Sequence, residues 1–379
     1  MTEKLYYEDP YVREFSATVI SSVCCDGGYD TVLDRTAFFP EEGGQSSDTG
    51  FISDSRVSYV YETDGTVHHI TDFKLYGTVD CRLDFDSRFD KMQCHTAEHI
   101  LCGIIHSIFG LDNVGFHLGD DEVTFDISAP LERSDLDKVE SLANEAVFRN
   151  IPIRAYFPNS DELSGIEYRS KLDITEGVRL VEIGDVDTCA CCAPHVSSTG
   201  EIGLIKILEA MKHRGGMRIW MVAGSRALTD YNEKYRNIRE ISAALSAPQH
   251  DTASALSSYM QDAEQIKYQL KLARRQLAEV KAETVPATDG NAVYYLEGFS
   301  IDDLRFFANA ATSKVGGILV SLCGSEGDYK YVITSKSVNL SAEIKAANSA
   351  LGGRGGGKPN AVQGSFSASL KEIREYFSA

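Results

Sequence analysis

A regular spacing of apolar residues in the second half of the chain constrains its fold most strongly. Apolar residues recur there in alternating steps of three and four: Leu256, Tyr259, Ala263, Ile266, Leu270, Ala273, Leu277 and Val280. This spacing places them on one stripe of a helix and is typical of a heptad seam. The chain therefore contains a long helix whose apolar stripe packs against another helix.

A second amphipathic stretch, over about 228–245, precedes the seam, and Ala247-Pro248-Gln249 separates the two. Proline interrupts a helix, so we expect two antiparallel helices that form an arm over 229–286, closed by Pro286. An intermolecular coiled coil would satisfy the same seam. The arm is thus also a candidate contact between two copies of the chain.

The remaining sequence predicts an α+β protein with three further domains. Residues 1–87 alternate short β-type runs with Gly and Asp turns, and predict a small β-barrel-like domain. Residues 88–228 mix helical and strand patterns, including a helix that Gly110 ends, and predict an α+β domain. Residues 287–379 predict a small α/β domain.

The charge of the chain restricts its partners. The formal net charge is −19, with 37 Lys and Arg against 56 Asp and Glu, whereas phosphate binding draws on Lys and Arg. Between Lys206 and Arg239, however, eight basic residues outnumber three acidic ones. This run indicates either a local basic surface or an ordinary solvated face.

No stretch predicts a signal peptide or a membrane span. The first residues are charged throughout, and nowhere do 18 apolar residues run together. The nine cysteines are odd in number and mostly scattered, which favours reduced thiols over a disulfide framework. We therefore expect a cytoplasmic protein with one possible metal site.

Two pairs of residues, each with at least one histidine, are the candidate ligands of that metal. His95 and His99 are four residues apart on a predicted helix, so both imidazoles project from one face. Cys191 and His195 repeat the spacing within the cysteine-rich stretch 187–196. The four side chains together form a Cys/His set suited to tetrahedral zinc.

Other interpretations of these residues stay open. His95-Thr-Ala-Glu98-His99 also matches H-x-x-E-H, the motif of inverted zinc proteases, in which Glu98 would be the general base. Cys189 and Cys192 form a C-x-x-C that could be a redox pair. Cys192 could also replace Cys191 as the ligand, because it lies three residues before His195.

Three stretches together resemble the editing domain of alanyl-tRNA synthetases: "LDRTAFFPEEGGQSSDTG" over 33–50, "HTAEH" over 95–99 and "CCAPHVSSTGEIG" over 191–203. The stretch "GGRGGGKPNAVQGS" over 352–365 resembles the glycine-rich motif of the DHH-associated C-terminal domain of the same synthetases. The β-rich segment begins almost at residue 1, which leaves no room before it for a synthetase core. The chain is thus similar to the free-standing alanyl-tRNA editing proteins in their long form.

The resemblance implies zinc bound by His95, His99, Cys191 and His195, and hydrolysis of the ester that joins serine or glycine to tRNA for alanine. The family more usually reads C-G-G-T-H where this chain has C-C-A-P-H over 191–195. The four-residue spacing between Cys191 and His195 is the same in both patterns. The hydroxyl group of the family's threonine is absent here, because Pro194 takes its place.

Polar residues near the matched segments are candidates for the catalytic pocket. Thr36 and Gln45 lie in the first segment and are expected to recognise the hydroxyl of serine, because a buried polar group discriminates against an analogue without one. His117 and Asp185 are two further pocket candidates. Serine is thus the first choice of substrate.

The glycine-rich segment is the candidate tRNA-binding site. Its glycines are expected to form a loop that turns backbone N–H groups towards a phosphate, with charge from the two basic residues. The residues are Gly353, Arg354, Gly355, Gly356, Gly357 and Lys358. A homodimer through the arm or the C-terminal domain is a further expectation. The alternatives in function are a zinc metalloprotease and a non-catalytic tRNA-binding protein.

Overall fold

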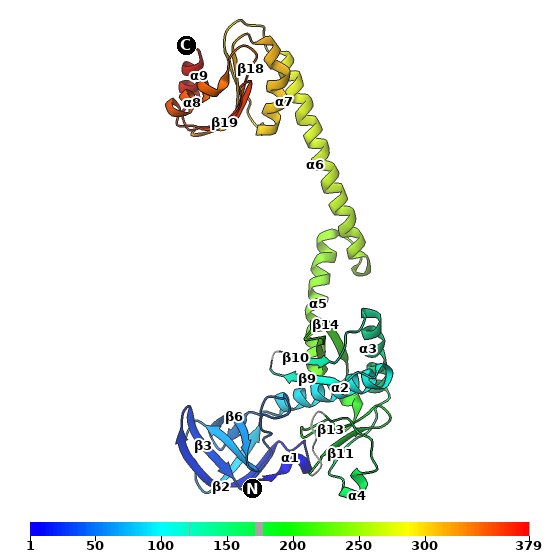
Figure 1. The fold of residues 1–379 in the computed structure, drawn as a ribbon. Helices are drawn as coiled ribbons and strands as arrows, with labels where there is room; N and C mark the ends of the chain where they lie inside the picture. The colour runs from blue at the N-terminus through cyan, green and yellow to red at the C-terminus, as the bar shows by residue number, and fades with distance from the viewer. Residues whose placement is uncertain (121, 171–176, 379) are drawn as a thin grey trace. The chain divides into compact units, whose positions relative to one another are not determined.

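The computed structural model describes residues 1–120, 122–170 and 177–378 as a mixed α+β protein (Figure 1). The α+β fold expected from the sequence is confirmed. The chain divides into two compact units, Met1–Ile238 and Arg239–Ala379. No helix in the described ranges is long and apolar enough to cross a membrane.

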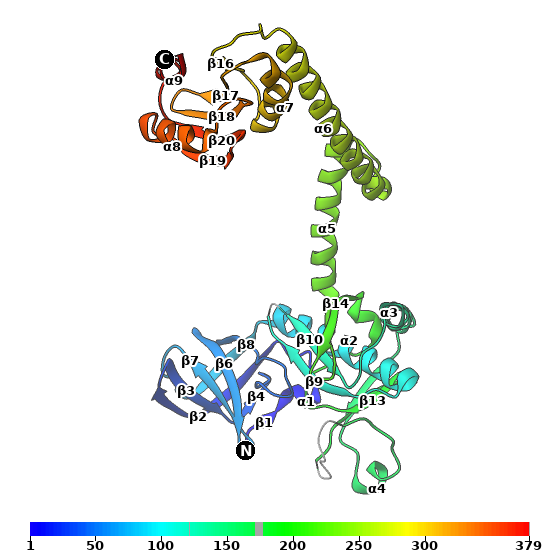
Figure 2. The same ribbon diagram turned by 45° about the horizontal axis from the view of Figure 1, so that its top comes forward.

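Six strands of the first unit close into a barrel (Figure 2). Their order around it is β2-β3-β7-β6-β5-β8. Alternate residues of β8 point inward, so Val79, Cys81 and Leu83 are buried. The strands are β2 (Glu14–Cys25), β3 (Gly28–Leu33), β5 (Gly50–Ile52), β6 (Ser55–Thr63), β7 (Thr66–Thr71) and β8 (Thr78–Leu83). Beside the barrel, the short strands β1 (Glu3–Lys4) and β4 (Arg35–Thr36) pair in parallel, and α1 (Leu5–Glu8) follows β1.

Helix α2 (Phe85–Phe109) is the central element of the rest of this unit. Asp84 caps its first turn by accepting a hydrogen bond from Ser87 N, and Gly110 ends it in the left-handed conformation with φ 66°. Most of its side chains are buried, among them His95 and His99. Polar side chains on such a helix need partners from the surrounding elements.

Two antiparallel sheets supply those partners, and both contact α2. Their strand orders are β14-β15-β10-β9 and β11-β12-β13. The strands are β9 (Asn113–Leu118), β10 (Val123–Ile127), β11 (Ile153–Tyr156), β12 (Leu180–Ile183), β13 (Asp187–Ala190), β14 (Ile205–His213) and β15 (Gly216–Ala223). The helices of this part are α3 (Arg133–Phe148), α4 (Ser160–Leu163) and the 3₁₀ turn η1 (Thr199–Ile202). Because β13 lies against α2, the residues that follow it lie beside the helix.

Two long helices correspond to the expected arm. They are α5 (Gly224–Leu245) and α6 (Thr252–Glu283), and Pro248 lies in the break between them, just before the 3₁₀ turn η2 (Gln249–Asp251). The boundary between the two compact units falls inside α5. The antiparallel packing of the two helices therefore stays a prediction.

The second unit contains a five-stranded sheet in the order β16-β17-β18-β20-β19. Helices α8 and α9 pack on one face, which includes Val320 and Leu322. Helix α7 and the last turns of α6 pack on the other face, which includes Leu319. The elements are β16 (Ala292–Tyr295), α7 (Ile301–Ala311), η3 (Thr312–Lys314), β17 (Ile318–Ser325), β18 (Asp328–Ser335), α8 (Leu340–Ala350), β19 (Arg354–Lys358), β20 (Ala361–Phe366) and α9 (Leu370–Ser378).

The glycine-rich segment is a strand, and the expectation of a loop was wrong. Residues 354–358 form β19, which pairs with β20 at the edge of the sheet. A Cβ at Gly355 or Gly364 would collide with the hydroxyl of Tyr331. The glycines are therefore needed for the close approach of two strands to a buried tyrosine, a role that composition alone does not reveal.

Candidate metal centre

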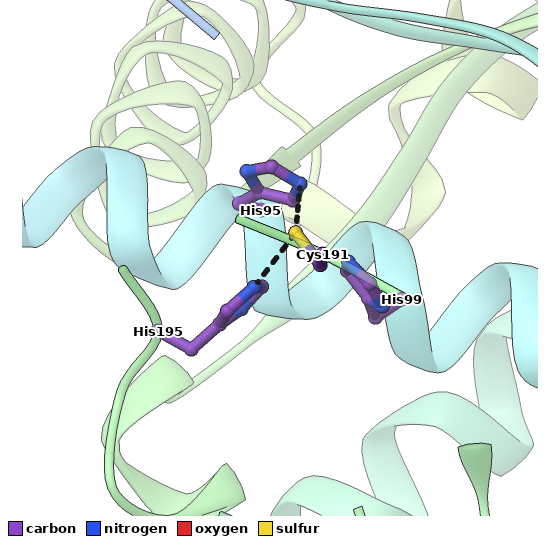
Figure 3. A group of neighbouring side chains, drawn as sticks. All are labelled: His95, His99, Cys191 and His195. Atoms are coloured by element: carbon purple, nitrogen blue, oxygen red, sulfur yellow. Dashed lines mark hydrogen bonds between the residues drawn. The ribbon is translucent and has the colours of Figure 1, made fainter. Parts of the chain in front are cut away.

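Three histidines and one cysteine from two segments of the chain meet in the first unit (Figure 3). His95 and His99 project from α2 one turn apart, whereas Cys191 and His195 lie in the segment between β13 and η1. Their ligand atoms all lie within 4.8 Å of one another. Cys191 Sγ is 3.6 Å from His95 Nε2 and 3.3 Å from His195 Nε2. This set can hold a metal ion.

The Nδ1 atoms of the two helical histidines are held by acceptors outside the cluster. His95 Nδ1 lies 2.7 Å from Gln45 Oε1, and His99 Nδ1 lies 3.3 Å from Asp187 Oδ2. An amide oxygen and a carboxylate accept hydrogen bonds, so each Nδ1 carries the proton and donates it. The Nε2 atoms are left with free lone pairs for a metal.

Thr96 holds His195 in the same way. Its hydroxyl donates to Met92 O at 2.7 Å, so its single proton is already used. The hydroxyl oxygen therefore accepts the hydrogen bond from His195 Nδ1, which lies 3.0 Å away. In their neutral form all three imidazoles therefore present an unprotonated Nε2, and a metal requires this tautomer.

Gln45 reaches His95 because the segment 43–46 pairs with the edge strand β9. Leu118 N donates to Gly44 O at 2.7 Å, and Ser46 N donates to Leu118 O at 3.0 Å. Gly44 has a positive φ of 86°, and a Cβ there would collide with Phe116 O. Only glycine allows this approach, so the Gly-Gly turn has a structural reason to precede Gln45.

The two neighbouring thiols have opposite electrostatic environments. Burial by itself would raise the pKa of Cys191, but His95 and His195 hold that pKa well below its usual value. Burial, and then the neighbouring Cys191, raise the pKa of Cys192. The ligand set contains Cys191, which would bind a metal as the thiolate, while Cys192 lies in the cavity wall.

Asp187 and Arg169 hold His99 from outside the cluster, and neither was among the predicted site residues. Asp187 accepts from Arg169 Nε at 2.8 Å and from Arg169 Nη2 at 2.7 Å, in addition to its contact with His99. Burial would raise the pKa of Asp187, but its hydrogen bonds with His99 and Arg169 lower it. The sequence contained a hint of this role, because Asp187 and Cys189 are two residues apart and share one face of β13, and Cys191 follows the strand directly. His99, Asp187 and Cys189 form a second, overlapping donor group.

A cavity of about 350 Å³ opens onto the cluster. Its volume is that of a small-ligand site. Arg179, which lines it, donates to Cys191 O at 3.0 Å and to Ala193 O at 2.8 Å, and so fixes the segment that carries the thiolate. The described lining consists of Tyr7, Glu42, Gly43, His95, Glu98, His99, Asn113, Phe157, Arg169, Ser170, Gly177, Val178, Arg179, Cys189, Ala190, Cys191 and Cys192.

None of the four expected pocket residues is in the described lining; Gln45 is fully buried behind His95. Thr36 is buried, accepts from Phe38 N and lies 2.9 Å from His69 Nε2. His117 is exposed on β9. Asp185 is exposed and pairs with Arg149 Nη2 at 2.7 Å, and this pairing lowers its pKa. Of the four expected pocket residues, Gln45 alone contacts a metal-ligand candidate in the described ranges.

Two domain families match the chain. The family described as the threonyl and alanyl tRNA synthetase second additional domain matches residues 178–219. The DHHA1 domain matches residues 289–379. The first match contains Cys191 and His195, and the second contains β19.

Curated relatives match nearly the whole chain, among them an editing protein and a ligase. The alanyl-tRNA editing protein AlaX-L of Pyrococcus horikoshii is 28% identical, over 98% of this chain and 96% of that protein. The alanine–tRNA ligase of Ignicoccus hospitalis is 29% identical, over 95% of this chain but only 40% of the ligase. Among solved structures, the C-Ala domain from Aquifex aeolicus alanyl-tRNA synthetase is 21% identical, with a TM-score of 0.22, over 25% of this chain and 97% of that domain.

Proposed function

Since this chain is a relative of the alanyl-tRNA editing proteins over its whole length, we propose that it hydrolyses mischarged tRNA for alanine in trans. The substrate is seryl-tRNA, with glycyl-tRNA as a second candidate, and the products are the free amino acid and tRNA. The observation that carries this proposal is the three-histidine, one-cysteine cluster, three of whose members line a cavity of suitable size.

Zinc is the metal that the donor set fits best. Zinc bonds of about 2.3 Å to sulfur and about 2.0 Å to nitrogen, at tetrahedral angles, separate the two ligand atoms by about 3.5 Å. The distances of 3.6 and 3.3 Å from Cys191 Sγ to two imidazole nitrogens agree with this value. A bound zinc ion would supply positive charge that polarises the ester and its attacking water.

The residues of the chain itself orient the reacting groups. Gln45, Thr96 and Asp187 fix the tautomer and the ring plane of the three imidazoles. Arg169 keeps Asp187 ionised, so that this carboxylate goes on accepting from His99. An aminoacyl ester is already activated, and preorganised polar groups of this kind are the main requirement for its hydrolysis.

Selection of serine requires recognition of its hydroxyl, because alanine is smaller and cannot be excluded by size. Gln45 uses Oε1 for His95, while its Nε2 is buried without a hydrogen-bond partner in the described structure. We assign this free donor to the serine hydroxyl. A buried donor that stays unpaired with alanine gives discrimination against alanine.

The edge strand β19 is the proposed tRNA contact. Arg354 and Lys358 are exposed at its two ends, and the glycines between them leave backbone groups accessible. Two cations and free N–H groups suit phosphate binding.

A homodimer through α6 or the C-terminal part is also proposed, since Leu256, Ile266 and Leu270 of the seam are exposed. Sedimentation equilibrium would test it.

Deacylation by the purified protein tests the proposal. We expect rapid hydrolysis of seryl-tRNA for alanine and slow hydrolysis of alanyl-tRNA. Equal rates would contradict the assigned selectivity, and no hydrolysis of any aminoacyl ester would contradict the function and leave tRNA binding alone. Cys191→Ala should lose bound metal and activity. Cys192→Ala, the matched control, should keep its metal.

The site does not favour a zinc metalloprotease. Its motif supplies Glu98 beside two histidine ligands, but it gives no role to a thiolate. Here Cys191 and His195 complete the ligand set. Cleavage of an unfolded protein substrate by the purified chain would favour the protease over the editing function.

A further inference from the structure

Glu98 has no role in the chemistry proposed above, although it lies between the two helical ligands. It follows His95 by three residues, precedes His99 and lines the same cavity. Its exposed fraction is 3%. A carboxylate so deeply buried is costly unless a cation or several hydrogen-bond donors compensate it.

One oxygen of this carboxylate is held and the other is not. Oε1 accepts hydrogen bonds from Asn113 Nδ2 and from Cys102 Sγ. Oε2 lies 4.0 Å from His99 Nε2, which is longer than a hydrogen bond. In the described ranges no donor reaches Oε2. The held oxygen fixes the side chain, while the second oxygen is available at the metal-ligand end of the cavity.

The other charged groups around the described cavity are already occupied or lie outside its interior. Asp187 is paired with Arg169 and His99. Arg179 donates to two backbone carbonyl oxygens. Glu42 is exposed. Among the described residues, Glu98 is therefore the buried carboxylate with an oxygen to offer, and that oxygen suits a cationic ligand.

We propose that Glu98 Oε2 binds the α-ammonium group of the aminoacyl ester. The assignment rests on the proposed function, because that function supplies the cation. An ammonium group has N–H donors to offer a carboxylate. Its nitrogen is two bonds, about 2.5 Å, from the ester carbonyl carbon. An ammonium bound at Oε2, beside His99, therefore places the ester next to the metal ligands.

Two esters of tRNA for alanine test this assignment: the seryl ester, and the same ester with a hydroxyl in place of the ammonium group. The two groups are similar in size, so charge is the main difference between them. We expect the wild-type protein to hydrolyse the seryl ester with a kcat/KM about 10- to 100-fold higher, as a charge-assisted hydrogen bond implies. Glu98→Gln should lose this preference and raise the KM of the seryl ester alone.

Glu98→Asp keeps the charge and should retain part of the preference. Glu145→Gln, which removes one exposed carboxylate outside the cavity, is the charge control and should behave as wild type. An equal fall in kcat for both esters in Glu98→Gln would make Glu98 a general base and overturn the assignment. Loss of bound metal in both Glu98 variants, or an unchanged preference, would also overturn it. Failure of the wild-type protein to hydrolyse either ester would instead overturn the proposed function itself.

Discussion

Three imidazoles in the first unit are oriented by three chemically different acceptors: an amide oxygen, a carboxylate and a hydroxyl. The carboxylate of Asp187 differs from the other two because it is charged and is itself held by Arg169. A charged acceptor makes a stronger hydrogen bond than a neutral one, although at 3.3 Å the contact of Asp187 with His99 is the longest of the three. Asp187 should therefore matter most to the affinity of the cluster for its metal.

Asp187→Asn should lower the metal affinity about 10- to 100-fold, the usual cost of losing such a support. Competition with a chelator, followed by measurement of bound metal, checks this expectation. Asp185→Asn is the matched control, because Asp185 is exposed and pairs only with Arg149 among the described residues. An equal loss in both variants, or a loss in the control alone, would contradict the structural distinction between the two aspartates.

His69, inside the barrel, should make the stability of the protein depend on pH. Burial lowers its pKa from 6.5 to about 4. Between these values the unfolded chain takes up a proton that the folded barrel excludes, so stability is complete above pH 6.5 and falls as the pH drops towards 4. The loss is up to about 3 kcal/mol in the free energy of unfolding.

Urea titrations at several pH values measure this dependence. His69→Gln should be less stable at pH 7 but should show a flatter pH profile. His117→Gln removes an exposed histidine and should leave the profile unchanged. An unchanged profile in His69→Gln would exclude the buried ring as its cause. Thr36 contacts His69 from β4, beside the barrel, and this contact explains why Thr36 is absent from the cavity lining.

At the scale of secondary-structure elements, local periodicity could be predicted from the sequence and tertiary neighbours could not. The four-residue spacing of His95 and His99 is sufficient to place both on one face of α2. The same-face rule for strands could not have selected Asp187 over Asp185, because the two are two residues apart; they differ in that β13 begins at Asp187. Nothing local, however, shows that Thr36 contacts a histidine 33 residues away, since this contact depends on how the barrel closes.

The strand β19 offers a test of why its glycines are present. A Cβ at Gly355 would collide with Tyr331 and with Gln363 O, whereas nothing lies within 4 Å of a Cβ at Gly356. Gly355→Ala should therefore destabilise the C-terminal sheet by about 1–3 kcal/mol, the usual cost of overpacking. Urea denaturation measures the change. Gly356→Ala is the control, and an equal loss in both variants would point to backbone flexibility as the reason for the glycines.

At the scale of the whole molecule, the net charge of −19 has to be reconciled with an RNA substrate. A strongly acidic protein repels a polyanion unless its cations are gathered at the contact. The affinity for tRNA should then depend on few phosphate contacts. It should also fall as salt is added, with a shallow slope.

Replacement of both Arg354 and Lys358 by alanine should weaken tRNA binding and reduce the slope of log affinity against log salt by about two. Filter binding at several salt concentrations measures this slope. Lys330→Ala, a change in the same sheet at a residue paired with Asp328, is the control. An unchanged slope in the double variant would place the phosphate contacts elsewhere in the chain.

The two halves of the ligand set are far apart in sequence: 96 residues separate His95 from Cys191. A metal held by both is thus a reversible cross-link that closes a long loop of the chain, and such a link restricts the unfolded ensemble more than a short one does. Because the ion binds the folded state, the melting temperature should rise with free zinc concentration. A shortage of zinc in the cell would then lower the stability of this protein.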